Sequence, residues 1–204
     1  MKKVKSPVHT SIMSGKLEGF RSVSTNTLTN DFCIKMNQGK KETICSHCYS
    51  HAMLSTYRKS TATALQRNSD LLSARVLKTE EIPLFKVGEA VRFSAHGELI
   101  NGIHMRNYVK IAELNPQAVF TLWTKRRDIV SQYCKRCPVP DNLIFIYSNP
   151  KLNDVMTTPP RFFHRTFNNV DTHPDENCTG QQCKDCMICY TIDHPTKVII
   201  EKVK

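Results

Sequence analysis

Two patterns of apolar residues alternate along this chain: stretches with apolar residues three or four positions apart, and short continuous apolar runs. From residue 53 to about residue 77 the apolar residues fall mostly three or four positions apart, and neither glycine nor proline interrupts them. This pattern predicts one long amphipathic helix. Two shorter stretches, about 103–114 and 126–133, predict further helices, and Asn115-Pro116 stops the first of these.

Between the helices lie short apolar runs that predict strands. We expect these strands over residues 89–94, 118–123, 142–147, 161–167 and 197–203. Because strands that alternate with helices form right-handed βαβ units, the pattern predicts an α/β fold with a mainly parallel sheet. The sheet is either open or a partial (βα) barrel.

The size of the chain favours one α/β core. With 204 residues, 40% of them hydrophobic, the chain is long enough for one good core and short of two full-sized domains. We expect residues 1–170 to form this core, and residues 171–204 to be a cysteine-rich, metal-binding segment packed on it. No run of 18 apolar residues occurs, and the first five residues lack the apolar stretch of an export signal. We therefore expect a soluble cytoplasmic protein that does not enter membranes.

Polar residues stand where the expected strands end. Parallel strands bring their carboxyl ends to one edge of the sheet, and α/β folds bind ligands at that edge. Loops are polar in any case, so one such residue indicates little, but four successive polar strand ends are what a site requires. The residues in question are Ser94, His96 and Glu98; Thr124 and Lys125; Ser148 and Asn149; and His164 and Arg165.

The nine cysteines point to metal. Their number is odd and no export signal precedes them, so reduced thiols are expected and not disulfides. The strongest group spaces its members like a ferredoxin loop that wraps an iron-sulfur cluster. Zinc, which usually takes two separated C-x-x-C hairpins, is the alternative. This group is Cys178-x4-Cys183-x2-Cys186-x2-Cys189.

A second group, Cys33, Cys45 and Cys48, precedes the long helix. The N-terminus of a helix favours thiolates and the anionic cluster that they would hold. Three thiolates leave one iron open to a small-molecule ligand, which is a catalytic arrangement. A histidine or a distant cysteine would equally complete a closed site. The role of a further C-x-x-C pair, Cys134 and Cys137, stays open between metal ligation and thiol exchange.

The charge adds a class of partner. The net charge is +11, and residues 1–60 carry ten Lys and Arg against three Asp and Glu. Such a field attracts phosphate-rich ligands, so a nucleotide or a nucleic acid is a candidate partner. Simple solubility explains the charge about as well, because no basic motif with interleaved aromatic residues is present. The sequence does not indicate an oligomeric state.

The order of motifs along the chain resembles that of known protein families. Cys45-x-x-Cys48-Tyr49 before a helix, and a strand ending in Gly97-Glu98, resemble the opening of a radical S-adenosylmethionine enzyme over roughly residues 33–125. More closely, the order of motifs is similar to a phage-encoded family, the mycobacteriophage gene product 88 type. Those motifs are Cys-x-x-Cys-Tyr, a helix, Arg92-Phe93-Ser94-x-x-Gly97-Glu98, a helix, Asn115-Pro116 and Phe120-x-x-Trp123-Thr124-Lys125.

This resemblance implies a cofactor and roles for single residues. Cys33, Cys45 and Cys48 would hold a [4Fe-4S] cluster, and Glu98 would contact the amino group of S-adenosylmethionine. His96, Thr124 and Lys125 would face the same cavity. The chain departs from radical enzymes in one respect: their ligands are spaced C-x3-C-x2-C, whereas eleven residues separate Cys33 from Cys45. Either a longer loop supplies the first ligand of an incomplete barrel, or the scaffold is kept without radical chemistry.

Two classes of function follow. One is an iron-sulfur enzyme of radical type, with one or two clusters, that acts on a nucleotide or modifies nucleic acid in a phage-infected cytoplasm. The other is a non-enzymatic protein in which zinc or iron-sulfur centres staple a domain that binds nucleic acid. For the enzyme, the expected catalytic residues are Glu98, His96 and Lys125, and the expected cofactor-binding residues are Ser94, Gly97, Glu98, Thr124 and Ser148.

Overall fold

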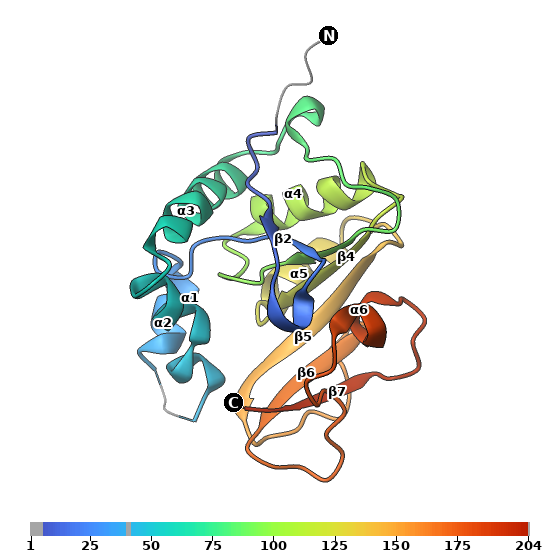
Figure 1. The fold of residues 1–204 in the computed structure, drawn as a ribbon. Helices are drawn as coiled ribbons and strands as arrows, with labels where there is room; N and C mark the ends of the chain where they lie inside the picture. Colours follow the sequence, from blue (N-terminus) through green and yellow to red (C-terminus); the bar gives the residue numbers. More distant parts are fainter. Residues whose placement is uncertain (1–5, 40–41, 204) are drawn as a thin grey trace.

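The computed structural model describes residues 6–39 and 42–203. Seven strands form one sheet in the order in which they follow along the chain, with β1 antiparallel to β2 and all later neighbours parallel (Figure 1). The predicted α/β class with a mainly parallel sheet is confirmed. The strands are β1 (Ser11–Ile12), β2 (Arg21–Val23), β3 (Ala90–Phe93), β4 (Val119–Thr124), β5 (Leu143–Leu152), β6 (Arg165–Val170) and β7 (Val198–Lys202).

The helices divide between the two faces of this sheet. The helices α4 and α5 pack on one face, and α6 with η4 lies against the other (Figure 1). Among the described residues the edge strands β1 and β7 do not pair with each other, so the sheet is open. The α-helices are α1 (Asp31–Asn37), α2 (Tyr49–Ser55), α3 (Lys59–Ala74), α4 (Gly102–Glu113), α5 (Arg127–Cys134) and α6 (Cys183–Cys186). The 3-10 helices are η1 (Gly15–Leu17), η2 (Ile44–His47), η3 (Thr79–Glu81) and η4 (Ile188–Tyr190).

Strand β4 shows how alternate residues serve the two faces. Phe120 and Leu122 are fully buried in the main core, beneath α4 and α5. Trp123 points to the other face, where it packs with the cysteine-rich segment that joins β6 to β7. That segment therefore covers a sheet face and returns to the sheet through β7. None of the helices in the described part of the chain is long and apolar enough to cross a bilayer.

The predicted helix over residues 53–77 is wrong in its extent, because the chain forms two helices there. Helix α2 starts earlier, at Tyr49, and a break at residues 56–58 separates it from α3. Hydroxyl groups compete for the backbone at this point: Ser55 Oγ donates to the His51 carbonyl at 2.8 Å and Thr56 Oγ1 to the Ala52 carbonyl at 2.7 Å. The break folds α2 back so that Met53 and Leu54 pack against Leu65 of α3.

Two strand boundaries also differ from the prediction. Strand β6 starts only at Arg165, so His164 and Arg165 lie at the beginning of a strand and not after its end. Strand β5 runs on to Leu152, so Ser148 and Asn149 belong to its second half. The short strands β1 and β2 were not predicted, since two and three residues are too few to show a period.

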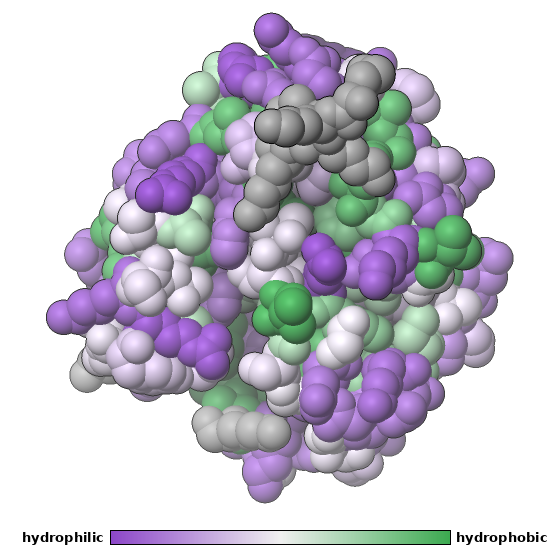
Figure 2. All heavy atoms as spheres, turned by 45° about the horizontal axis from the view of Figure 1, so that its top comes forward, coloured by the Kyte–Doolittle hydropathy of each residue, from purple (hydrophilic) through white to green (hydrophobic). Residues whose placement is uncertain are grey.

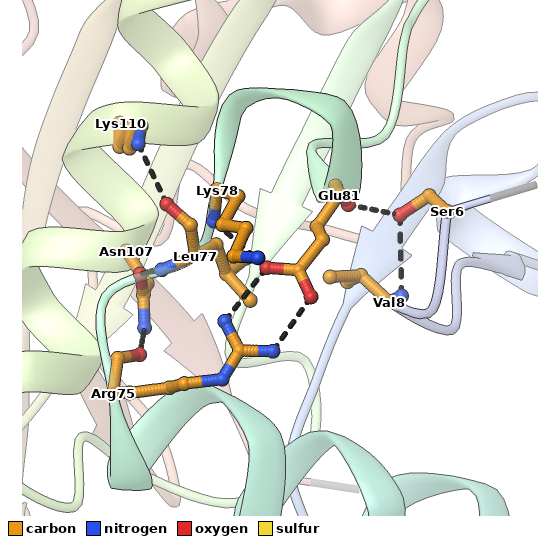
Figure 3. A network of polar contacts seen from close by, with 8 residues as sticks. All are labelled: Ser6, Val8, Arg75, Leu77, Lys78, Glu81, Asn107 and Lys110. Atoms are coloured by element: carbon orange, nitrogen blue, oxygen red, sulfur yellow. Dashed lines mark hydrogen bonds and ion pairs between the residues drawn. The ribbon is translucent and has the colours of Figure 1, made fainter. Parts of the chain in front are cut away.

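The connection from α3 to β3 is held by a polar network (Figure 3). Glu81 accepts two hydrogen bonds from the Arg75 guanidinium, at 2.7 and 2.6 Å, and its carbonyl accepts from Ser6 of the N-terminal segment. The Arg75 contact lowers the pKa of Glu81 to about 2. Leu77 donates its N–H to Asn107 of α4 at 2.8 Å. The network thus ties the N-terminal segment and the end of α3 to the helix layer.

His104 of α4 predicts how stability depends on pH. The ring is fully buried, its Nδ1 accepts the Ile100 N–H at 3.2 Å, and burial lowers its pKa to about 3 from an ordinary value of 6.5. In the unfolded chain the ring binds a proton near pH 6.5, so the free energy of unfolding falls as the pH drops from 6.5 toward 3. We expect His104→Gln to reduce this slope by up to about 1.4 kcal/mol per pH unit.

Urea unfolding of both proteins at several pH values in this window measures the slopes. Other buried histidines contribute equally to both proteins and therefore cancel in the comparison. Parallel curves for the two proteins would contradict the assignment.

Candidate functional site

Three cysteines that lie far apart along the chain line one cavity at the carboxyl edge of β3, β4 and β5. Cys33 comes from α1, Cys45 from η2, and Cys48 caps the N-terminus of α2. The cavity has a volume of about 150 Å³. The expected grouping of these thiols beside the strand ends therefore exists in the fold.

Side-chain amides hold the cysteine segments in place. Asn30 caps α1 by accepting the Cys33 N–H at 3.2 Å, and its own amide donates to the Glu98 carbonyl at 2.9 Å. Asn37, at the end of α1, donates to the Cys45 carbonyl at 2.9 Å. These two asparagines, which sequence reasoning missed, tie the thiol-bearing loop to itself and to the loop after β3. The capping position of Asn30, just before an amphipathic turn, is a signal that could have identified it.

Most of the strand-end residues predicted for the site line the same cavity. The loop after β3 and the ends of β4 and β5 supply Ser94, His96, Gly97, Glu98, Lys125 and Ser148. Thr124 is fully buried behind them and donates its hydroxyl to Glu98. Asn149 is engaged elsewhere, since its amide donates to the Asp154 carbonyl at 2.6 Å and to Asn168 at 3.1 Å.

Glu98 is the most heavily bonded group of the cavity wall. Its Oε1 accepts from Thr124 Oγ1 and from the Leu99 N–H at 3.0 Å, and its Oε2 accepts from the Lys125 N–H at 2.7 Å. Only 4% of the residue is exposed. A carboxylate has about four acceptor positions, so one on Oε2 is left for a further donor.

Burial sets the protonation of the cavity. Burial raises the pKa of the Cys33 and Cys45 thiols, so both are neutral thiols near pH 7. Burial alone would lower the pKa of Lys125, but the negative charges of Glu98 and of the three nearby cysteines in their thiolate form raise it overall, and Lys125 is an ammonium. Its Nζ donates to Ser148 Oγ at 3.1 Å. A metal centre that bound these thiols would have to displace their protons, beside a cation that favours the resulting negative charge.

His96 and Gly97 form the tight turn after β3. His96 Nδ1 lies 2.9 Å from Ser50 Oγ, which in turn lies 2.6 Å from Thr27 Oγ1. The Gly97 N–H donates to the same Thr27 hydroxyl at 2.9 Å. Burial, with help from two nearby arginines, lowers the pKa of His96 to about 4, so the ring is neutral. The turn thereby connects the strand end to α2, which carries Cys48 at its cap.

A second group of thiols surrounds a small apolar pocket on the opposite face of the sheet from α4 and α5. It contains the four C-terminal cysteines Cys178, Cys183, Cys186 and Cys189. Lys16 of η1 donates to Cys178 Sγ at 3.2 Å. Burial raises the pKa of Cys189 to about 12, against the opposing effect of Arg92 and Arg165. Three cations therefore surround the four thiols.

Three donors near the thiols are buried without a partner in the described part of the chain. Within the described residues, the Nε of Arg92, the indole N–H of Trp123 and one terminal nitrogen of Arg165 are buried without a hydrogen-bond partner. Trp123 lines the first cavity and, like Cys178 and Cys189, packs against the apolar cluster of Ile144, Ile146, Phe167 and Ile199. The Arg92 guanidinium stands 4.2 Å from the centre of the Trp123 ring. Buried donors normally have partners, so their presence fits a site that receives an anionic group.

The thiols are not arranged around a single ion. In the described parts of the chain, no group of three or more His, Cys, Asp or Glu side chains could hold a metal ion as it stands. In a cubane cluster each thiolate binds a different iron, which needs a wider spacing than the ligands of one zinc ion. The donor set, all sulfur and with cations around it, fits an anionic cluster in its chemistry.

Cys134 and Cys137 lie elsewhere. They line a pocket with His164, at the edge of the sheet where β5 and β6 begin. Burial, and then Cys137, raises the pKa of Cys134 to about 11, which makes it a poor nucleophile near neutral pH. His164 accepts the Phe145 N–H on its Nδ1 at 2.9 Å. Neither the pair nor His164 belongs to the cavity at the carboxyl edge.

One comparison with known proteins gives a match. The model of a protein family described as Gene product 88 matches residues 22–200, which is most of the chain and includes both groups of thiols. No curated protein and no solved structure matches.

Gly97 gives a test of how tightly the cavity wall is built. Its φ is +72°, and a Cβ there would lie 2.6 Å from the Thr25 carbonyl oxygen. Gly88 has the same φ of +72° with open space around it, so it is a matched control. We expect Gly88→Ala to cost about 1–2 kcal/mol from its backbone alone. Gly97→Ala is expected to lower the free energy of unfolding by about 1–3 kcal/mol more, because the added methyl group would overpack the wall.

Chemical unfolding of the two variants measures these costs. Equal losses of stability would show that the close approach of Gly97 to Thr25 is unimportant.

Proposed function

The chain belongs to the gene product 88 family, and on the geometry of its edge cavity we propose that it is an iron-sulfur enzyme of radical S-adenosylmethionine type. One observation carries the proposal. Cys33, Cys45 and Cys48 come from three separate elements, yet they meet in one cavity at the carboxyl edge of a parallel sheet. Strands in sequential order, with a site at that edge, are the arrangement of (βα) enzymes.

In this proposal the three cysteines of the edge cavity hold a [4Fe-4S] cluster. Such a cluster, when bound, supplies an electron to S-adenosylmethionine at the iron that has no cysteine ligand. Lys125 stabilises the negative charge of the thiolates, and Ser148 orients its ammonium group. The acceptor position left on Glu98 Oε2 is suited to the amino group of the cofactor, while its other hydrogen bonds keep the carboxylate fixed.

The four C-terminal thiols would hold a second, closed centre. Four thiolates leave no open position, so the role of this centre is structural or electron-transferring. Its cations, Lys16, Arg92 and Arg165, offset the negative charge that four thiolates bring to an apolar pocket. We further propose that the substrate is a nucleotide or nucleic acid, and that the protein works in the cytoplasm of a phage-infected host.

A second candidate is a protein without enzyme activity, in which metal only staples a fold that binds nucleic acid. The pocket of the four C-terminal thiols favours it, because stapling the segment between β6 and β7 onto the sheet needs no open site. In that case zinc is an alternative to a cluster. The two candidates differ at the edge cavity, where only the enzyme needs a cluster.

Metal content separates the two candidates. We expect anaerobically prepared protein to be brown, with broad absorption near ~400 nm. Cys45→Ser is expected to remove about four irons per chain, the content of one cubane, and Cys186→Ser to remove the iron of the other centre. Cys134→Ser is the matched control and should leave the iron content unchanged, because that thiol lies at the other edge of the sheet.

Colourless protein that contains zinc, or a Cys45→Ser variant with full iron content, would refute a cluster in the edge cavity.

Enzyme activity is a separate test. With a strong one-electron reductant such as dithionite, the protein is expected to cleave S-adenosylmethionine reductively, and Cys45→Ser should abolish this cleavage. The measurement is the loss of S-adenosylmethionine under anaerobic conditions, with Cys134→Ser as control. An unchanged rate in Cys45→Ser would leave only the stapled binding protein.

A further inference from the structure

A groove leads across the surface to the edge cavity. It lies between the N-terminal segment of β1 and η1 on one side and the helices α2 and α3 on the other. Its volume of about 580 Å³ exceeds that of the cavity, and the two share Arg92, Ala95 and His96 in their walls. The space-filling view shows a hollow in the surface on this side of the molecule, with polar and apolar atoms mixed around it (Figure 2). The groove therefore adjoins the edge cavity.

The walls of the groove favour an anionic ligand. Among the described residues that line it there is no Asp or Glu, although the chain has 18 of them. Two arginines and several hydroxyl groups are present instead, which are the groups that bind phosphate. The polar side chains of the lining are His9, Ser11, Ser14, Tyr49, Arg58, Ser60, Thr61, Arg92 and His96.

Arg58 is the free cation of this groove. It is exposed, at the start of α3, and within the described residues its guanidinium has no ion pair or hydrogen bond. It is close enough to His96 to contribute to the lowering of that pKa, after burial and Arg92. The positive charge of Arg58 is therefore available to a ligand in the groove.

An exposed aromatic pair stands beside Arg58. Of the Phe, Tyr and Trp side chains, all of which lie in the described residues, only Tyr49 and Tyr57 are exposed, at 67% and 70%. Tyr49 lines the groove, and the two rings are close enough to raise the pKa of Tyr49, after burial. Exposed aromatic rings next to a cation form the kind of platform on which unpaired bases stack. A duplex, whose bases are already stacked, would gain less from it.

We propose that this groove binds single-stranded nucleic acid, with Arg58 and Arg92 on backbone phosphates and Tyr49 stacked on a base. The strand then runs past His96 toward the edge cavity. Binding itself does not depend on the proposed function, because Tyr49, Arg58 and Arg92 are not cluster ligands; only the reaction that follows binding rests on it. The substrate would then be an unpaired stretch of a polynucleotide.

Fluorescence anisotropy with a labelled oligonucleotide of about twelve nucleotides tests the proposal. Tyr49→Ala is expected to weaken binding about fivefold or more, whereas Tyr49→Phe keeps the ring and should bind as the parent does. Arg58→Gln should reduce the slope of log affinity against log salt by about 0.7, the share of one phosphate contact. Arg136→Gln removes the same charge from an exposed site at the end of α5 and should leave the affinity nearly unchanged.

A duplex of the same sequence is expected to bind more weakly than the single strand. Equal binding of the duplex, or parent-like binding by Tyr49→Ala, would overturn the stacking platform. An effect of Arg136→Gln as large as that of Arg58→Gln would overturn the location and leave only general attraction to a basic protein.

The Cys45→Ser variant keeps this test apart from that of the proposed function. If its affinity for the single strand is that of the parent while its iron is lost, the groove stands independently of the cluster. If Cys45→Ser loses the oligonucleotide as well, binding depends on the metal centre and the groove is not the binding site by itself.

Discussion

The cavity depends on the carboxylate of Glu98 and the backbone around it. Its side chain accepts three hydrogen bonds from the β3 loop and the end of β4, and its carbonyl accepts from Asn30 at the start of the cysteine-bearing loop. The ladder hydrogen bonds of parallel strands end with the strands, so the loops at the carboxyl edge need other contacts to hold them to one another. A buried carboxylate with three hydrogen-bond donors joins them and holds them in a rigid geometry. The positions of Lys125 and Cys33 both follow from it.

The second constraint is electrostatic. Thiols in apolar surroundings are protonated, and a centre that replaces those protons would bring negative charge to both faces of the strand ends. The fold places cations beside both groups of thiols: Lys125 at the edge cavity, Lys16 and Arg165 at the C-terminal cysteines, and Arg92 near both. Lys16 also forms an ion pair with Glu201, and Arg165 also donates to the carbonyls of Thr191 and Thr196. Trp123 lines the edge cavity and packs on the same apolar cluster as Cys178 and Cys189. Arg92 also lines the edge cavity, and it opposes the rise in the pKa of Cys189. The two sites are therefore neighbours.

The sequence predicted the parts of this arrangement that follow from periodicity and spacing. The order of strands and helices led to the parallel sheet, and the sheet led to the strand ends with His96, Glu98 and Lys125. What it could not predict depends on contacts between distant residues. The break before α3 comes from hydroxyls that choose backbone partners, and β2 has no period to read. Arg92 and Trp123 read as ordinary strand residues, because their position near both thiol groups exists only once the C-terminal segment covers the sheet.

The cavity and the groove differ in how far the protein itself satisfies their polar and aromatic groups. Inside the cavity, the Glu98 carboxylate is held by three donors. Along the groove, the Arg58 guanidinium has no partner among residues 6–39 and 42–203, and Tyr49 is exposed. Apart from Tyr49 and Tyr57, the fold buries its aromatic rings or covers them in part. Exposing an aromatic ring forgoes the stabilisation that its burial would give. A fold that leaves an arginine and an aromatic ring available along this groove has a surface suited to a ligand with both phosphates and flat apolar faces.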